Sequence, residues 1–180
     1  MFRAQVEESL ELRLLELRHA KALFNLIDQN REHLSYWFHD VAKTKTVEDC
    51  EMDIREALER FSKGEAFQLG IWLDKVLVGA LGARDISSLF CSAEIGYWLS
   101  GDHQGRGVMS KVCTYLCTYL FEERNLNRIE IRCSVKNSRS KAIPERLGFR
   151  LEGTLRQMGY TKDGLTDYLV YGLLRDEWQN

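Results

Sequence analysis

The chain has 180 residues, 44% hydrophobic and 29% charged, a composition typical of a folded globular protein and not of a disordered chain. Its net charge of −2 disfavours a general nucleic-acid binder, which usually carries a strong basic excess, so no direct nucleic-acid partner is expected. The five cysteines are scattered without a Cys-x-x-Cys pair, which favours reduced thiols packed in the core of a cytoplasmic protein over metal ligands.

The chain shows no sign of a membrane segment or of a boundary between domains. Its first residues lack the apolar stretch of a secretory signal, and no apolar run approaches the roughly 20 residues of a membrane span. No repeat and no Pro/Gly/Ser-rich linker interrupts the sequence. We therefore expect residues 1–180 to form one domain, without a membrane partner and without a metal site.

The pattern of apolar residues predicts an alternation of strands and helices. In chain order these are a strand over 10–16, helices over 18–27, 31–39 and 46–62, strands over 67–73, 76–85 and 92–99, a helix over 107–124, a strand over 128–135, a helix over 137–147, and strands over 149–160 and 168–174. Thr46-Val-Glu-Asp49 resembles a capping box at the start of the third helix, and Gly64 is expected to end that helix. This order mixes hairpins with a strand–helix–strand crossover, which predicts an α/β (α+β) class with one mixed sheet covered by helices.

The segment Gln104-Gly-Arg-Gly107 joins a predicted strand to the longest predicted helix. Gly105 and Gly107 permit positive φ and a close approach of a ligand to the backbone, and the helix N-terminus adds roughly half a positive charge. The segment indicates either a tight turn or an anion-binding cradle, to which Arg106 adds a full charge. It lacks the third glycine of a dinucleotide fingerprint and the Gly-Lys-Ser/Thr of a Walker loop, which argues against both.

A second strand-to-helix corner begins at Asn137, which is a candidate N-cap for the helix that follows. Ser140 lies in the first turn of this helix, where its hydroxyl is expected to face the same cleft. Arg139 and Lys141 add positive charge beside it.

The two corners together resemble the GNAT superfamily of acyl-CoA N-acyltransferases, and in particular its ribosomal-protein N-terminal acetyltransferase, or Rim-type, branch. The resemblance is carried by Ala93-Glu-Ile-Gly-Tyr-Trp-Leu99, Gln104-x-x-Gly107, Asn137-x-x-Ser140 and Glu145-Arg-Leu-Gly-Phe149, in an element order that covers nearly the whole chain. It implies a single GNAT-like domain with a mixed, mostly antiparallel sheet of about seven strands, flanked by helices. Two central parallel strands, over 92–99 and 128–135, would splay apart.

The resemblance also implies acetyl-CoA as a co-substrate and a set of residues that bind it. Backbone N–H groups from 104 to 110 would hold the pyrophosphate, and the strand edge at 97–99 would pair with the pantetheine arm, which Asn137 would also bond. Met109 departs from the family pattern, which has Gly or Ala there. The predicted cofactor-binding residues are Tyr97, Trp98, Leu99, Gln104, Gly105, Arg106, Gly107, Val108, Met109, Ser110, Asn137 and Ser140.

Direct transfer to an amine needs a base for the amine and an acid for the leaving thiolate. Many family members use a tyrosine as the acid at the position that holds Pro144 here, so Ser140 is the predicted acid. Glu94 is the predicted base, with a paired structural carboxylate as the alternative. Cys133 lies on a cleft strand. Its thiol either forms a covalent acyl intermediate or packs in the core as a small apolar side chain.

The first third of the chain is expected to supply the acceptor groove, as in the family. Tyr36-Trp37-Phe38 is either an aromatic wall of that groove or part of the core, and Tyr160 and Tyr168 are candidates for its mouth. The acidic helix over 46–62 either attracts a basic acceptor or is a solvated face.

The predicted acceptor is the N-terminal amine of a ribosomal or other protein. Two alternatives stay open, a small amine such as a polyamine, amino acid or drug, and a CoA-binding module without catalysis. Assembly with further copies of the chain also stays open.

Overall fold

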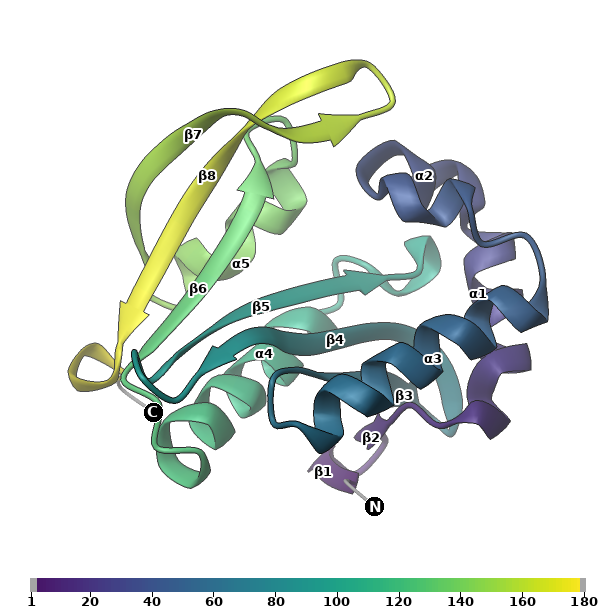
Figure 1. Ribbon diagram of the computed structural model, residues 1–180, viewed down its shortest axis with the longest axis horizontal. Helices are drawn as coiled ribbons and strands as arrows, with labels where there is room; N and C mark the ends of the chain where they lie inside the picture. The colour runs from purple at the N-terminus through teal and green to yellow at the C-terminus, as the bar shows by residue number, and fades with distance from the viewer. Residues whose placement is uncertain (1–2, 179–180) are drawn as a thin grey trace.

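The computed structural model describes residues 3–178, through which one mixed sheet of eight strands runs (Figure 1). The strands follow the order β1-β2-β3-β4-β5-β6-β8-β7 across the sheet, and β5 and β6 form its parallel pair. The strands are β1 (Arg3–Glu7), β2 (Leu10–Leu14), β3 (Phe67–Leu73), β4 (Val76–Ser87), β5 (Ser92–Leu99), β6 (Arg128–Ser134), β7 (Arg150–Thr161) and β8 (Gly164–Leu174).

Helices lie between the strands in the predicted order. They are α1 (Ala20–Gln29), α2 (Arg31–Trp37), α3 (Val47–Ser62), α4 (Val108–Thr118) and α5 (Ser138–Arg146), with short turns η1 (Leu17–His19), η2 (His39–Ala42), η3 (Gly101–His103) and η5 (Arg175–Glu177). The long helix predicted over 107–124 ends as α4 at Thr118 and continues as a π-helical turn, η4 (Tyr119–Glu123).

Local sequence signals fix several of these boundaries as predicted. The hydroxyl of Thr46 accepts from the Asp49 amide, and the Asp49 carboxylate accepts from the Thr46 amide at 2.9 Å, so Asp completes the capping box of α3. Gly64 follows the helix with φ of +73°, a left-handed conformation that glycine adopts without strain.

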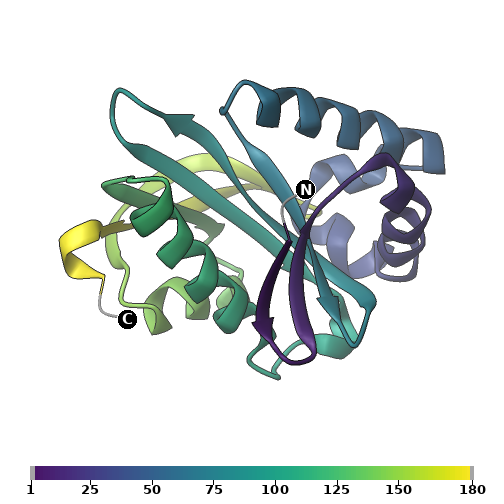
Figure 2. The same ribbon diagram turned by 90° about the horizontal axis from the view of Figure 1, so that it is seen from below.

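The sheet has eight strands rather than the predicted seven or so, because β1 pairs with β2 at its outer edge (Figure 2). The β1 sequence, Arg-Ala-Gln-Val-Glu, is short and mostly exposed, with Ala4 as its buried residue. Such a charged edge strand carries too weak an apolar alternation to be predicted. The last strand, β8, begins at Gly164, four residues before the predicted start, because its first part pairs with the exposed hairpin arm β7.

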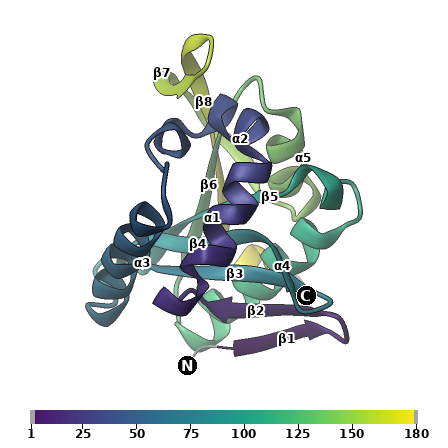
Figure 3. The ribbon, with the colours of Figure 1, turned by 90° about the vertical axis from the view of Figure 1, so that its right-hand side faces the viewer.

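Helices cover both faces of the sheet, with α1 and α3 on one side and α4 and α5 on the other (Figure 3). Val112 and Leu116 of α4 pack with Ile95 and Ile131 of the central strands in the larger core cluster. A second cluster joins α1, α2 and α3 to β3 and β4 through residues such as Ile54. Each face of the sheet therefore packs against its helices through a separate cluster of buried residues.

The parallel strands β5 and β6 separate halfway along their length, as the family resemblance implies. Their pairing runs from Ser92↔Arg128 to Ile95↔Ile131. Beyond that point β5 stays paired with β4 up to Leu99, and β6 stays paired with β8 up to Ser134. The sheet therefore opens into a wedge between the two strand ends.

Candidate active site

The wedge leaves one backbone edge of β5 without a strand partner. The Ser100 amide donates to the Val78 carbonyl at 2.9 Å, which fixes the residues whose backbone groups face β4. Because hydrogen-bonding groups alternate along a strand, the backbone groups of Tyr97 and Leu99 face the side that β6 has left. They form a strand edge that an extended ligand can pair with.

The N-terminus of α4 lies at the mouth of this wedge and has free donors. Gly107 is the N-cap with φ of +78°, and it offers no side chain to cap the helix. The first backbone bond into the helix runs from the Lys111 amide to the Gly107 carbonyl at 3.1 Å. The amides of Val108, Met109 and Ser110 therefore have no acceptor within their own helix, and with the helix dipole they form an anion-binding cradle.

Gln104 links three elements around the cradle through its side-chain amide. Its Nε2 donates to the Leu99 carbonyl at 3.1 Å and lies 2.9 Å from His33 Nε2, while its Oε1 accepts from Arg139 at 2.5 Å. The carbonyl on one side and the guanidinium on the other fix which way the amide points. Gln104 thus connects the end of β5 to α2 and to α5.

The orientation of Gln104 also sets the state of His33. Since the Gln104 NH₂ group points at His33 Nε2, that nitrogen accepts and the proton of a neutral ring lies on Nδ1. Burial lowers the pKa of His33 below its usual 6.5, and the Arg139 guanidinium lowers it further. Both effects favour the neutral ring.

The opposite wall of the wedge is the first turn of α5. Asn137 caps this helix, as predicted, by accepting from the Ser140 amide at 3.0 Å. The Tyr97 hydroxyl donates to the Ser140 carbonyl at 3.0 Å, so the side chain of Tyr97 joins β5 to α5 across the base of the wedge. Asn137, Ser138, Arg139 and Ser140 of this turn line the cleft, and of these Asn137 and Ser140 were predicted to bind the cofactor.

Cys133 on β6 lies next to Ser140, and the residue is 5% exposed. Burial raises its pKa to about 11, so the thiolate needed for a covalent acyl intermediate is scarce at neutral pH. Core packing is therefore the reading of Cys133 that the structure supports.

These walls enclose a cavity of about 780 Å³. Of the twelve predicted cofactor-binding residues, eleven line it, namely Tyr97, Trp98, Leu99, Gln104, Gly105, Gly107, Val108, Met109, Ser110, Asn137 and Ser140. The exposed side chain of Arg106 does not line it. Their contacts with a cofactor stay a prediction.

Glu94, the predicted base, lies outside the cavity walls. Its side chain is 8% exposed, and its oxygens pair with the guanidinium groups of Arg84 and, at 3.5 Å, Arg132. This is the ion pairing expected of a structural carboxylate, and a catalytic role for Glu94 stays a prediction.

The cavity also includes residues outside the predicted set. On α5, Ala142, Ile143 and Arg146 share the face toward the cavity with Arg139, whose charge beside Ser140 was expected, and the helical repeat of these positions is the sequence signal for them. Arg146 donates to the Ser110 hydroxyl at 2.5 Å and thereby joins α5 to α4. His33 lies 71 residues before Gln104, and no local pattern points to their contact.

A second cavity, of about 430 Å³, opens on the α3 side of the central strands. Leu34, Trp37, Phe38 and Trp98 line both cavities, so the two adjoin through the wedge. Of the predicted aromatic wall, Trp37 and Phe38 line the second cavity, and Tyr160 and Tyr168 line it as well. Tyr36 points elsewhere, toward the β7–β8 turn.

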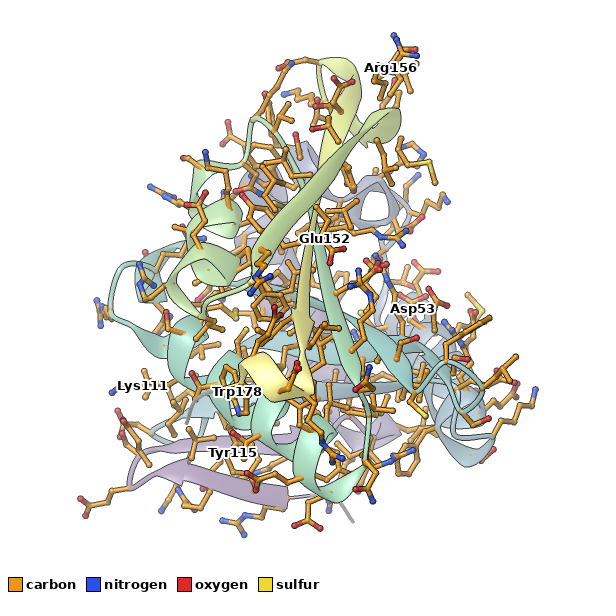
Figure 4. The ribbon with its side chains drawn as sticks, turned by 90° about the vertical axis from the view of Figure 1, so that its left-hand side faces the viewer. Asp53, Lys111, Tyr115, Glu152, Arg156 and Trp178 are labelled. Carbon is orange, nitrogen blue, oxygen red and sulfur yellow. The ribbon has the colours of Figure 1, made fainter. Side chains whose placement is uncertain are left out.

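The second cavity is lined by two carboxylates, Asp40 and Asp53. The Lys43 ammonium, which does not line the cavity, pairs with Asp40 at 2.7 Å, so Asp53 is the carboxylate without a lysine or arginine partner among the ion pairs of residues 3–178. Burial raises the pKa of Asp53, and the nearby carboxylates of Glu56, Asp40 and Asp49 raise it further. A cation in this cavity would relieve that repulsion. Figure 4 shows Asp53 and the α4 residue Lys111 on opposite sides of the molecule.

Residues 3–178 hold no group of three or more histidine, cysteine or acidic side chains arranged to hold a metal ion. Within the same residues, every helix is too short or too polar to cross a membrane.

The chain is similar to acetyltransferases over nearly its whole length. A family model described as an acetyltransferase (GNAT) domain matches residues 9–150. YdaF of Bacillus subtilis, named as a candidate ribosomal N-acetyltransferase, is 33% identical over 180 residues, which cover 99% of this chain and 98% of YdaF. The ribosomal-protein-serine acetyltransferase of Escherichia coli is 31% identical over 172 residues, 96% of each chain.

A solved structure shares the fold closely. It is RimL, an alpha-N-protein acetyltransferase of a ribosomal protein, in complex with coenzyme A bound to a cysteine as a disulfide. It superposes with a TM-score of 0.93 at 27% identity and covers 96% of this chain and 98% of its own.

Proposed function

The chain belongs to the GNAT family of acetyltransferases, and from that premise we propose that it transfers the acetyl group of acetyl-CoA to the N-terminal amine of a ribosomal protein. The observation that carries this proposal is the wedge between β5 and β6, with free helix donors at its mouth and a cavity on each side. An anionic cofactor fits the side with amide donors and arginines, and an amine fits the side with carboxylates.

Acetyl-CoA would be held by backbone donors and by cations that flank them. The amides of 108–110 suit the pyrophosphate, and Arg139 and Arg146 lie beside them on the cavity-facing side of α5. The edge of β5 formed by the Tyr97 backbone groups and the Leu99 amide suits the amide groups of the pantetheine arm, and the Asn137 side-chain nitrogen adds a donor. These assignments place the thioester inside the wedge.

The transfer joins the amine nitrogen to the acetyl carbon and breaks the bond from that carbon to sulfur. A free β5 amide at the wedge can donate to the carbonyl oxygen as it gains negative charge. The Ser140 hydroxyl is the predicted proton donor to the leaving thiolate and would regain its proton from solvent. Glu94 stays the predicted acceptor of the amine proton, which would have to reach it through water because Glu94 lies outside both cavities. The proposal is direct transfer, and the raised pKa of the Cys133 thiol, which leaves little thiolate near neutral pH, supports it over an acylated cysteine.

We propose that the acceptor enters through the second cavity. Its volume of about 430 Å³ suits a chain end or a small amine rather than a folded surface. The carboxylates of Asp40 and Asp53 would attract a protonated N-terminus, and the aromatic walls would pack against the residues that follow it.

Residues 1–180 would act as one domain. All five cysteines are free thiols, which suits work in the reducing cytoplasm, where ribosomal proteins are made.

The proposed function is tested by following release of the CoA thiol with three kinds of acceptor at equal concentration. These are ribosomal proteins with free N-termini, lysine-containing peptides whose N-termini are blocked, and spermidine. We expect release with the first kind alone. Release with spermidine and not with the proteins would replace the proposal by small-amine acetylation, and cofactor binding without any release would leave a CoA-binding module.

A further inference from the structure

Aromatic side chains from four parts of the fold line the second cavity. They come from the end of α2, from β5 and from the β7–β8 hairpin, which faces α2 across the open end of the wedge (Figure 1). We call these side chains the aromatic cage, and they are Trp37, Phe38, Trp98, Tyr160 and Tyr168. Among residues 3–178, no lysine or arginine lines the same cavity. Because the faces of aromatic rings carry negative partial charge, a cavity of this kind suits a positively charged ligand.

Neighbouring residues hold the rings of the aromatic cage in place. The Trp37 ring packs edge-on against Tyr36, with centroids 4.6 Å apart. Trp98 packs against the buried cluster that lies beneath α1 and α3. The Tyr168 ring occupies the space above Gly159, where an added Cβ would collide with the ring. The aromatic cage is therefore formed before any ligand enters it.

Asp53 adds a full negative charge to the wall of the second cavity. The other carboxylate in that wall, Asp40, is paired with Lys43, whereas Asp53 has no lysine or arginine partner among the ion pairs of residues 3–178. Burial raises the pKa of Asp53, and the carboxylates around it raise that pKa further. A cation held by the rings would reduce the repulsion among these carboxylates.

The walls of this cavity recognise positive charge better than they recognise N–H groups. A protonated N-terminal amine has three N–H groups that lose water when it enters, and ring faces replace that water poorly. A trimethylated amine keeps the positive charge and has no N–H group to leave without a partner. Aromatic rings around a carboxylate therefore suit a methylated ammonium group at least as well as an unmodified one.

We propose that the aromatic cage binds chain ends whose N-terminal nitrogen carries three methyl groups, and that such chain ends inhibit the enzyme. A trimethylated nitrogen has neither a proton to lose nor a lone pair with which to attack the thioester, so it occupies the acceptor position without reacting. This inference rests on the proposed function, because it places a chain end in the second cavity. A chain methylated at its N-terminus would then block the acetylation of an unmodified chain.

The test compares two peptides of the same sequence, one capped with a trimethylglycyl group and the other with a tert-butylacetyl group. The caps have the same shape and differ in charge, because the quaternary nitrogen of the first is a carbon atom in the second, and neither offers an amine to acetylate. Their Kd values are measured from the fluorescence of Trp37 and Trp98, and their inhibition is measured against an acceptor peptide that begins with serine. We expect the charged peptide to bind about tenfold more tightly and to compete with the acceptor.

Two substitutions of Tyr168 separate the effect of the ring from that of its hydroxyl. Tyr168→Leu removes a ring from the aromatic cage and should lower the preference for the charged peptide about threefold. Tyr168→Phe keeps the ring and is the matched control, in which the preference should stay at the wild-type value.

Equal affinity of the wild type for the two capped peptides would overturn this inference, because shape alone would then explain the binding. Inhibition by the tetramethylammonium ion at the same concentration as the charged peptide would overturn the assignment to chain ends. Failure of the wild type to acetylate any peptide would overturn the proposed function. The fluorescence titration needs no turnover, so it still decides whether the cavity distinguishes the charged cap from the neutral one.

Discussion

The two sides of the central strands differ in charge and in the kind of group that supplies it. On the α4–α5 side, backbone amides and arginines surround the larger cavity. On the α3 side, carboxylates and aromatic rings surround the smaller one. Leu34, Trp37, Phe38 and Trp98 line both cavities, so the two adjoin beside the end of β5. The difference teaches that one interruption in a sheet can bring a cation-rich cavity and a carboxylate-bearing cavity together.

Loss of the Ser140 hydroxyl should have the largest effect, because Ser140 lines the cofactor cavity and is the predicted acid for the leaving thiolate. If it protonates the leaving thiolate, Ser140→Ala should lower kcat about a hundredfold, the usual contribution of a general acid. The apparent Kd for CoA, measured by calorimetry on the same variant, should stay within about threefold, since backbone groups and arginines hold the cofactor. An unchanged kcat at saturating substrate would remove Ser140 from the mechanism.

A change at the helix N-terminus should affect the cofactor side alone. Gly107→Ala forces a side chain into a left-handed conformation at the cradle. If the turn keeps its conformation, this costs roughly 1–2 kcal/mol, and if the turn relaxes, the amides of the cradle move. We expect the KM for acetyl-CoA to rise about tenfold.

Gly64→Ala is a matched control for that variant. Gly64 has φ of +73° against +78° for Gly107, and in both an added Cβ meets open space. Both variants should lose similar thermal stability, but only Gly107→Ala should change the KM for acetyl-CoA. Equal changes in KM would show that the effect is one of stability.

The acceptor side should respond to loss of charge at Asp53. Asp53→Asn should raise the KM for an N-terminal acceptor peptide about fivefold and leave the KM for acetyl-CoA unchanged, because a partly exposed charge contributes about 1 kcal/mol. Glu51→Gln, on the same helix but outside the cavity wall, is the control. An equal effect of both variants would mean that the helix attracts the acceptor by its overall charge.

The smallest expected effect is the pH dependence that His33 brings to the cofactor side. The folded protein lowers the pKa of His33, so the unfolded chain takes up its proton at a higher pH than the folded one. The contribution of His33 to stability is therefore complete above about pH 6.5 and is lost as the pH falls through the lowered pKa.

We expect His33→Gln to lose less stability than the wild type between neutral and acid pH, as measured by thermal unfolding. The KM for acetyl-CoA should also rise less steeply in acid, since a protonated His33 cannot accept from Gln104. Identical pH profiles for variant and wild type would contradict this role.

The sequence predicts the parts of the molecule whose causes are local. The capping box at Thr46, the short connection between the strands predicted over 67–73 and 76–85, and the N-cap at Asn137 each depend on residues within a few positions of one another, and the structure has all three. The corner at Gln104–Gly107 and the corner at Asn137–Ser140 are also local, and they carry the resemblance to the family.

The remaining features depend on contacts between distant segments. Tyr36 and Asp163 are 127 residues apart, and His33 and Gln104 are 71 apart, so neither pair leaves a periodic trace in the sequence. The place of Glu94 on a cleft strand predicts a base, but alternation along a strand alone does not reveal that Arg84 and Arg132 lie opposite it. The sequence therefore predicts the local motifs and the charges of the site, but it does not predict which distant side chains pair.

The most direct test of the account is the position of the acetyl group on a single peptide that offers both a free N-terminal serine and an internal lysine. The protein is incubated with acetyl-CoA and this peptide, and fragmentation in a mass spectrometer locates the modification. The account predicts one acetyl group, on the N-terminal nitrogen, and none on the same peptide with a blocked N-terminus. Acetylation of the lysine in both peptides would contradict it.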